Sequence, residues 1–177
     1  LSLDERARLG LGIAFQRPPT IRGLTLRNTV LAFSRSSKNG RFVEEMAARV
    51  NLQQLLDRQV NHGFSGGELK RSELLQLLVQ QPRFVMFDEP ESGVDLDSIA
   101  LVGQVINELL GENNGQAREK AGLIITHTGH ILNYVRADRG HVLLDGTIGC
   151  SGDSLEMLEN IRAGGYQNCV KCTRRPR

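Results

Sequence analysis

Two adjacent carboxylates follow an apolar run near the middle of the sequence. The run is Phe84–Phe87, and Asp88 and Glu89 come directly after it. Four consecutive apolar residues predict a strand buried on both faces of a sheet, and open α/β sheets bind ligands beyond the carboxyl ends of such strands. Asp88 could hold a hydrated magnesium ion, and Glu89 could orient a water for attack on a phosphate. The alternative is a capped strand followed by a solvated loop.

A serine and two glycines form a second candidate site. Ser65, Gly66 and Gly67 precede a segment with an apolar helical face, which begins at Glu68 and ends before Pro82. Unpaired backbone N–H groups and the positive end of a helix would bind an anion such as a terminal phosphate there. The alternative is an ordinary helix N-cap formed by Ser65, which is the commoner role for serine at such a position.

Two further polar side chains stand where predicted strands end. Gln16 follows the apolar run Leu11–Phe15, and His127 follows Leu123–Thr126. An imidazole could hydrogen-bond a phosphate oxygen, and an amide could reach a metal ion or a water. A lone histidine is more often structural or solvated, so the combination of residues carries the prediction rather than any one of them.

Apolar spacing predicts the elements that position these residues. Short apolar runs indicate buried strands, and apolar residues at helical spacing indicate helices between them. The strands alternate with helices, which predicts an α/β layer with a mostly parallel sheet, interrupted by a helical region. The expected elements are a helical region from Thr25 to about Gln81, helices at Ile99–Leu110 and Leu155–Arg162, a surface loop at Gly111–Gly122 and a hairpin at His141–Gly149.

Composition excludes several classes of protein. The chain has 177 residues, 40% hydrophobic residues and a net charge of +2, as in an ordinary globular domain. That charge favours neither a nucleic acid nor an anionic membrane as partner, and no apolar run approaches the roughly 20 residues of a membrane helix. We therefore expect no nucleic-acid partner and no direct membrane insertion. Three cysteines are too few for a disulfide scaffold, which favours a cytoplasmic location.

Cys169 and Cys172 form a CxxC pair near the end of the chain. One such pair supplies half of a four-thiolate site. Two thiols on a surface tail are the simpler interpretation, and a cluster or zinc site completed by a partner is the alternative. Cys150 is expected to be buried in the hairpin.

The chemistry-bearing residues, taken in order, resemble the motifs of ABC-type ATPases. Gln16, Ser65–Glu68, Asp88-Glu89, Ser92–Asp95 and His127 occur in the order Q-loop, signature, Walker B, D-loop and H-switch. The resemblance implies a P-loop NTPase-like (RecA-like) α/β fold with an inserted helical subdomain. It implies ATP and Mg²⁺ as ligands, and a head-to-tail homodimer that forms on ATP binding.

The resemblance also implies a role for each matching residue. Asp88 and Gln16 would serve Mg²⁺, Glu89 would be the general base, and His127 would contact the γ-phosphate. The residues expected to close on ATP bound by the partner subunit, or to lie at the dimer seam, are Ser65, Gly66, Gly67, Glu68 and Asp95. The expected division is a core of residues 1–16 and 82–162, a helical subdomain at about 17–81, and a tail at 163–177.

The phosphate-binding loop of the family has no match in the sequence. No G-x-x-x-x-G-K-[ST] occurs, and the dipeptide Gly-Lys is absent. In the family this loop precedes the Q-loop and supplies the phosphate cradle and a lysine. The resemblance therefore implies truncation at the N-terminus. Residues 1–177 alone are expected to bind ATP poorly and to be inactive.

Within the family, the chain most resembles the SufC-type ATPases of iron–sulfur cluster assembly. Glu68 stands where transporters commonly have Gln, and Glu91 where they more often have Thr or Ser, although Pro90 is transporter-like. This resemblance implies a SufB/SufD-like scaffold as partner. The alternatives are the nucleotide-binding subunit of an ABC transporter and a non-catalytic fragment that binds a partner.

Overall fold

The computed structural model describes residues 1–33, 40–111 and 120–173, apart from the side chains of residues 96, 97 and 167–173. The chain divides into two compact units, Leu1–Tyr134 and Val135–Arg177. All predicted site residues except Cys169 and Cys172 belong to the first unit. The predicted division into core, helical subdomain and tail stays a prediction.

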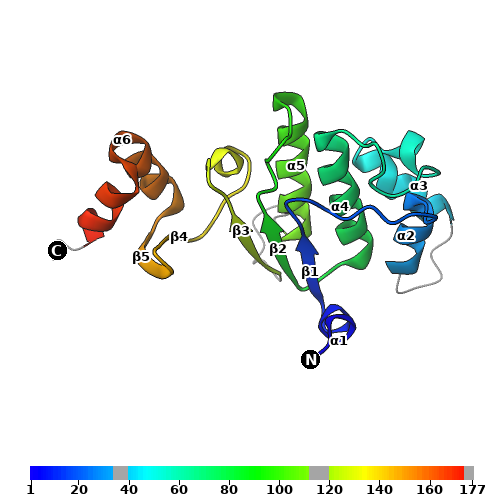
Figure 1. Ribbon diagram of the computed structural model, residues 1–177, viewed down its shortest axis with the longest axis horizontal. Helices are drawn as coiled ribbons and strands as arrows, with labels where there is room; N and C mark the ends of the chain where they lie inside the picture. The colour runs from blue at the N-terminus through cyan, green and yellow to red at the C-terminus, as the bar shows by residue number, and fades with distance from the viewer. Residues whose placement is uncertain (34–39, 112–119, 174–177) are drawn as a thin grey trace. The chain divides into compact units, whose positions relative to one another are not determined.

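A three-stranded parallel sheet forms the centre of the first unit (Figure 1). Its strands are β1 (Leu11–Ala14), β2 (Phe84–Asp88) and β3 (Ala121–Ile125), with β2 in the middle. Ala14 pairs with Phe87, and Asp88 pairs with Ile125, so all three carboxyl ends meet at one edge. The predicted α/β fold with a parallel sheet is therefore confirmed.

Two helices cover one face of this sheet. The helix α4 (Gly66–Gln80) packs on β1 and on α5 (Leu96–Leu109). Gly12 of β1 allows this approach, because a Cβ there would lie 2.7 Å from the side chain of Leu77. Under the helices, Val85 and Phe87 of β2 are fully buried, which makes β2 the strand on which the core is built.

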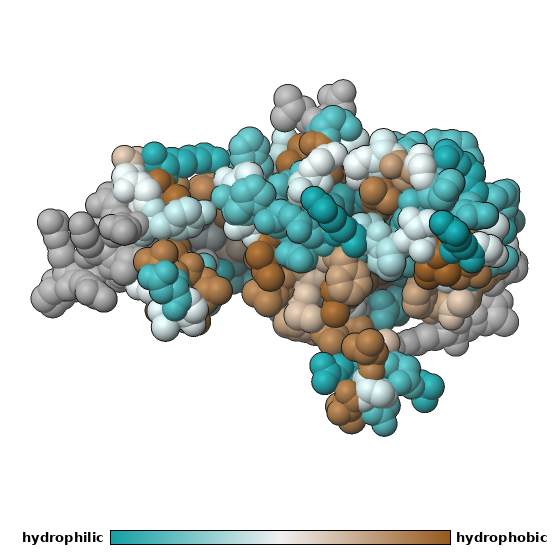
Figure 2. Space-filling view, viewed as in Figure 1, coloured by the Kyte–Doolittle hydropathy of each residue, from teal (hydrophilic) through white to brown (hydrophobic). Residues whose placement is uncertain are grey.

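The opposite face of the sheet is apolar and exposed. Alternate residues of a strand point to the same face, and this face carries Ile13 (37% exposed), Phe84 (38%) and Leu123 (46%). Figure 2 shows apolar residues gathered over the region of the strands. No helix among the described residues of this unit covers that face.

The connection from β1 to β2 contains the predicted helical region. It consists of α2 (Leu26–Phe33), α3 (Gly40–Arg49), the short 3₁₀ helix η1 (Gln53–Leu55) and α4. Apolar residues of this connection are fully buried, among them Leu26, Val30, Val43 and Leu52. Most of the polar break expected at Arg35–Arg41 lies outside the described residues.

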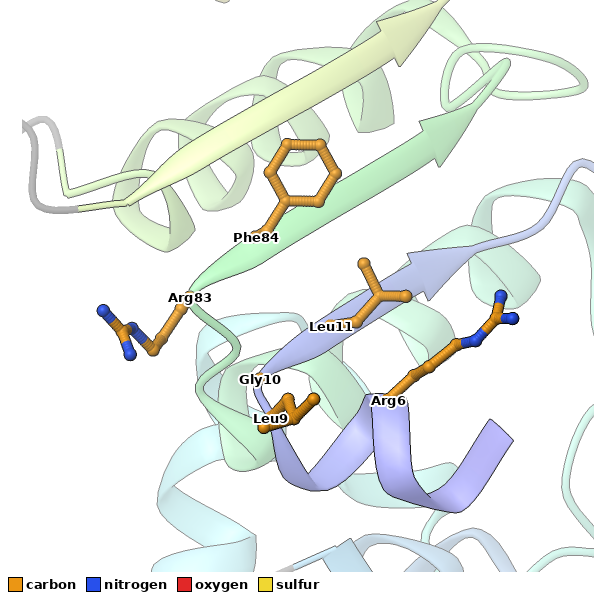
Figure 3. Close-up of a pocket in the computed structure, with 6 residues that line it drawn as sticks. All are labelled: Arg6, Leu9, Gly10, Leu11, Arg83 and Phe84. Atoms are coloured by element: carbon orange, nitrogen blue, oxygen red, sulfur yellow. The ribbon is translucent and has the colours of Figure 1, made fainter. Parts of the chain in front are cut away.

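The amino ends of the strands carry a separate feature. The helix α1 (Leu3–Arg8) precedes β1 and has a capping box between Ser2 and Glu5. A shallow open depression lies beside it and is lined by residues of α1, β1 and the start of β2 (Figure 3): Arg6, Leu9, Gly10, Leu11, Arg83 and Phe84. None of these is a predicted site residue.

The second unit is a hairpin with a helix packed on it. The strands β4 (Gly140–Leu144) and β5 (Thr147–Gly152) are antiparallel. Asp145 and Gly146 both have positive φ, as the predicted tight turn requires. The helix α6 (Ser154–Thr173) packs Met157 against Val142 and the buried Cys150. This helix begins near the predicted position but continues beyond Arg162, across a non-helical Gly165 (φ 74°).

Among the described residues, no helix combines the length and the apolar character that crossing a membrane requires.

Candidate active site

Glu89 lies where the carboxyl ends of the three strands converge. It is the first residue after β2, and its backbone N–H donates to the carbonyl of Ile125 at 2.9 Å. The carboxylate has a partner on each oxygen. Gln16 Nε2 donates to Oε2 at 2.5 Å, and His127 Nδ1 lies 2.8 Å from Oε1. The structure therefore brings together three residues that the sequence predicted as a group, one from the end of each strand.

The contact with Glu89 fixes the orientation of the His127 ring. The assignment with Nδ1–H as donor and a Glu89 oxygen as acceptor leaves Nε2 as the ring nitrogen that faces away from Glu89. A phosphate oxygen would then have to meet Nε2. The His127 side chain is 63% exposed and that of Glu89 is 18% exposed, so the imidazole borders solvent whereas the carboxylate is set deeper.

Asp88 is the last residue of β2 and is partly buried. Its carboxylate and the side-chain oxygen of Gln16 are of the ligand type that Mg²⁺ prefers, and Mg²⁺ binds through one or two protein oxygens while it keeps several waters. These residues therefore fit a hydrated magnesium ion. Among the described residues, no group of three or more His, Cys, Asp or Glu forms a ready-made metal cage.

Two buried charged residues of α4 hold the backbone that leads into Gln16. Lys70 Nζ donates to the carbonyls of Phe15 and Gln16 at 2.9 and 3.0 Å, and Glu73 Oε1 accepts from the Phe15 N–H at 2.8 Å. Neither role was predicted from the sequence. Lys70 and Glu73 lie one turn apart on the same side of α4 as the buried Leu74 and Leu77. Their position within this apolar stripe was the only sign in the sequence that the two charged side chains would be buried.

Burial dominates the electrostatics of this pair. It lowers the pKa of Lys70, although the carboxylates of Glu73, Asp88, Glu89 and Glu91 oppose that change. Burial raises the pKa of Glu73 to about 7, against the opposing effects of the Phe15 N–H and Lys70. The local environment therefore favours the neutral forms of both side chains more than water does.

The segment Ser65–Glu68 forms the first turn of α4. Ser65 is the N-cap, and its hydroxyl and the Glu68 carboxylate form a reciprocal capping box. The common interpretation of Ser65 as a helix cap is therefore what the structure shows. A role of these residues in binding a phosphate stays a prediction.

Asp95 lies beside this turn. It is the N-cap of α5 and accepts from the Ser98 N–H at 2.8 Å. A Cβ on Gly67 would lie 3.5 Å from Asp95 Oδ2, and one on Gly66 would lie 2.1 Å from the carbonyl oxygen of Gly93. The two predicted motifs thus pack against each other within one chain, with glycines at the points of closest approach.

The side chains of Cys169 and Cys172 lie outside the described residues, so the CxxC hypothesis stays a prediction.

The sequence matches known proteins over most of its length. The family model described as ABC transporter matches residues 3–92. A probable ABC transporter ATP-binding protein of Streptococcus pyogenes serotype M3 is 39% identical over 94% of this chain, and the chain spans 66% of that relative. A probable ATP-dependent transporter SufC of Escherichia coli K12 is 35% identical over 94% of this chain and 69% of its own length.

The fold also matches solved structures. An ATP-binding cassette of an ABC transporter in its ADP conformation superposes with a TM-score of 0.66 at 21% identity, over 95% of this chain and 70% of that chain. Fold, motif order and sequence identity agree, and the chain belongs to the ABC transporter family of ATP-binding proteins.

Proposed function

We propose that this chain is part of an ATP-hydrolysing, SufC-like subunit that drives iron–sulfur cluster assembly on a SufB/SufD-like scaffold. The observation that carries the catalytic part is the placement of Glu89. Its carboxylate is held from both sides by Gln16 and His127, at the edge of the sheet where open α/β folds bind ligands.

The geometry suits a general base. A carboxylate has about four lone-pair positions, so Glu89 can still accept a water after binding Gln16 and His127. Those contacts fix its orientation before a substrate arrives, which lowers the cost of aligning the water. Asp88 would hold Mg²⁺, which supplies charge neutralisation to the phosphates when bound. His127 would place Nε2 against the terminal phosphate.

The subunit would act as a head-to-tail homodimer. The first turn of α4 offers backbone N–H groups and a positive helix end, and Asp95 lies against it. In the proposed dimer, Ser65, Gly66, Gly67 and Glu68 close on the ATP of the other subunit, and Asp95 lies at the seam. ATP binding would thereby be converted into movement of the scaffold, in the cytoplasm.

The second candidate is the nucleotide-binding subunit of a membrane transporter. The streptococcal relative supports it through its name and its 39% identity, and the Escherichia coli relative named SufC supports the first candidate at 35% identity. Glu68 and Glu91 favour the first candidate, because transporters more often carry Gln and Thr or Ser there.

Purification of the full-length native protein with its partners separates the two candidates. We expect the protein to co-purify, without detergent, with a scaffold protein that carries iron and sulfide. Recovery with a polytopic membrane protein would instead assign the chain to a transporter.

Glu89→Gln in the full-length protein tests the catalytic assignment. Loss of the general base should lower ATP turnover by about 100-fold or more, while ATP binding persists because the isosteric amide keeps the local packing. Glu45→Gln is the matched control, since Glu45 is an exposed residue of α3 paired with Arg41. Equal turnover by both variants would remove Glu89 from the mechanism.

A further inference from the structure

A third buried carboxylate, Glu91, lies two residues beyond Glu89. It is only 7% exposed, and its oxygen Oε1 accepts hydrogen bonds from two hydroxyls, those of Thr126 and Thr128. The Thr128 bond is 3.0 Å long. These two threonines are the residues on either side of His127, so one carboxylate oxygen binds both neighbours of the histidine.

The same hydroxyls also accept from the backbone. The Gly129 N–H donates to Thr126 Oγ1 at 2.9 Å, and the His130 N–H donates to Thr128 Oγ1 at 3.2 Å. A hydroxyl that accepts a backbone bond still has one proton to donate, and in both threonines that proton is directed to Glu91. These hydrogen bonds close the turn that carries His127. The turn leads into the 3₁₀ helix η2 (His130–Asn133).

We propose that Glu91 is a positioning residue that holds His127 against Glu89 by anchoring Thr126 and Thr128. This inference rests on the proposed function for its effect on catalysis. Glu89 and Glu91 then act as a pair on one short segment. Glu89 binds the imidazole itself, and Glu91 binds the residues before and after it.

This role needs a side chain long enough to bring one acceptor oxygen within hydrogen-bond distance of both hydroxyls. A serine or threonine hydroxyl also has two acceptor lone pairs, but its stem is shorter than that of glutamate and does not extend to where Glu91 Oε1 lies. The second oxygen of Glu91, Oε2, is buried and has no hydrogen-bond partner among the described residues. A buried, half-satisfied carboxylate is costly, so the two threonine hydroxyls are the groups that offset this cost.

Kinetics of the full-length protein test the catalytic consequence. Glu91→Ala should lower kcat for ATP hydrolysis by about 10- to 100-fold, because a displaced catalytic group costs rate rather than binding. KM for ATP should stay within about 2-fold, since Glu91 is not proposed to touch the nucleotide. Thr128→Val should lower kcat in the same direction, and Thr128→Ser, which keeps the hydroxyl, should restore it. Thr29→Val controls for the loss of a buried threonine hydroxyl, because the Thr29 hydroxyl donates to the carbonyl of Thr25, the residue before α2.

The histidine itself provides a readout that does not depend on activity. Nitrogen chemical shifts of the His127 ring, measured on nucleotide-free full-length protein, report which nitrogen carries the proton. Glu91→Ala and Thr128→Val should both move the Nδ1 signal away from its wild-type value, whereas Thr29→Val and Thr128→Ser should not. An unchanged His127 signal in both Glu91→Ala and Thr128→Val would overturn the proposal. If the wild-type full-length protein shows no ATPase activity while the variants show the expected changes in the His127 signal, that result would count against the proposed function and not against the role of Glu91.

Discussion

Glu89, the proposed general base, has an unusual backbone conformation. Its φ is 47°, in a region that residues other than glycine adopt only in a few per cent of cases. Such conformations cost free energy and persist where the surroundings fix them. Here the surroundings are the backbone bond to Ile125 and the side-chain contacts to Gln16 and His127. The conformation and the site are therefore held by the same neighbours.

Residue types at strand ends made part of this site predictable. Gln16, Glu89 and His127 each follow an apolar run, so their convergence follows from a parallel sheet alone. Lys70, Glu73 and Glu91 could not be placed in this way, because their partners depend on how α4 and the 126–130 turn pack on the strands. The sequence shows a charged residue but not the backbone atom 55 positions away that it binds.

Gly66→Ala tests the close packing between the first turn of α4 and the backbone of Gly93. The added Cβ would meet the Gly93 carbonyl oxygen at 2.1 Å, so one backbone segment must move. We expect a loss of about 1–3 kcal/mol in the free energy of unfolding, measured by urea denaturation.

Gly40→Ala provides the matched control. Gly40 is also the first residue of a helix, and a Cβ there meets nothing within 4 Å among the described residues. This change should be neutral or slightly stabilising. Equal stabilities for the two variants would contradict the predicted clash.

The helix α4 connects the two halves of the proposed mechanism. Its first turn carries Ser65 and the signature glycines, and its second and third turns carry Lys70 and Glu73, which bind the Phe15–Gln16 backbone. A rigid rotation of this helix would therefore move its first turn and the Phe15–Gln16 backbone together. The sequence predicted the helix from its start signal and from Pro82, but not this connection.

Glu73→Gln should alter how stability depends on pH. The pKa of Glu73 is raised from 4.5 to about 7 in the folded chain, so between these values the folded state holds a proton that the unfolded state releases. The free energy of unfolding of the wild type therefore falls as pH rises through this window, by about 3 kcal/mol at most, and the contribution is flat above it. Glutamine cannot release a proton, so the variant lacks this fall.

Urea denaturation from about pH 5 to about pH 8 checks this result, as the difference between wild type and variant. Glu45→Gln on the surface of α3 should follow the wild type. Parallel curves for wild type and Glu73→Gln would show that Glu73 titrates normally.

At the scale of the molecule, the family's fold was predictable because three apolar runs alternate with helices. The extent of α6 was not, because Gly165 interrupts the helix without ending it. The division at Tyr134 was not predictable either, since it depends on contacts between residues far apart in the sequence.

The absence of a phosphate-binding loop sequence leads to a prediction for residues 1–177 expressed alone. This polypeptide contains Glu89 but no G-x-x-x-x-G-K-[ST], so it should show no turnover of ATP above that of its own Glu89→Gln variant. A phosphate-release assay with both polypeptides measures this. Turnover that disappears in the variant would show that other residues bind the nucleotide.

The long connection between β1 and β2 has a consequence for how the chain folds. Gln16 and Glu89 are 73 positions apart, and Glu89 can be bound on both sides only after β1, β2 and β3 have paired. Such non-local pairing is slow compared with helix formation, because a long loop must close before any contact stabilises it. The helices between β1 and β2 need no such closure. Helical structure should therefore return early during refolding, and the arrangement around Glu89 should be among the last parts of the chain to form.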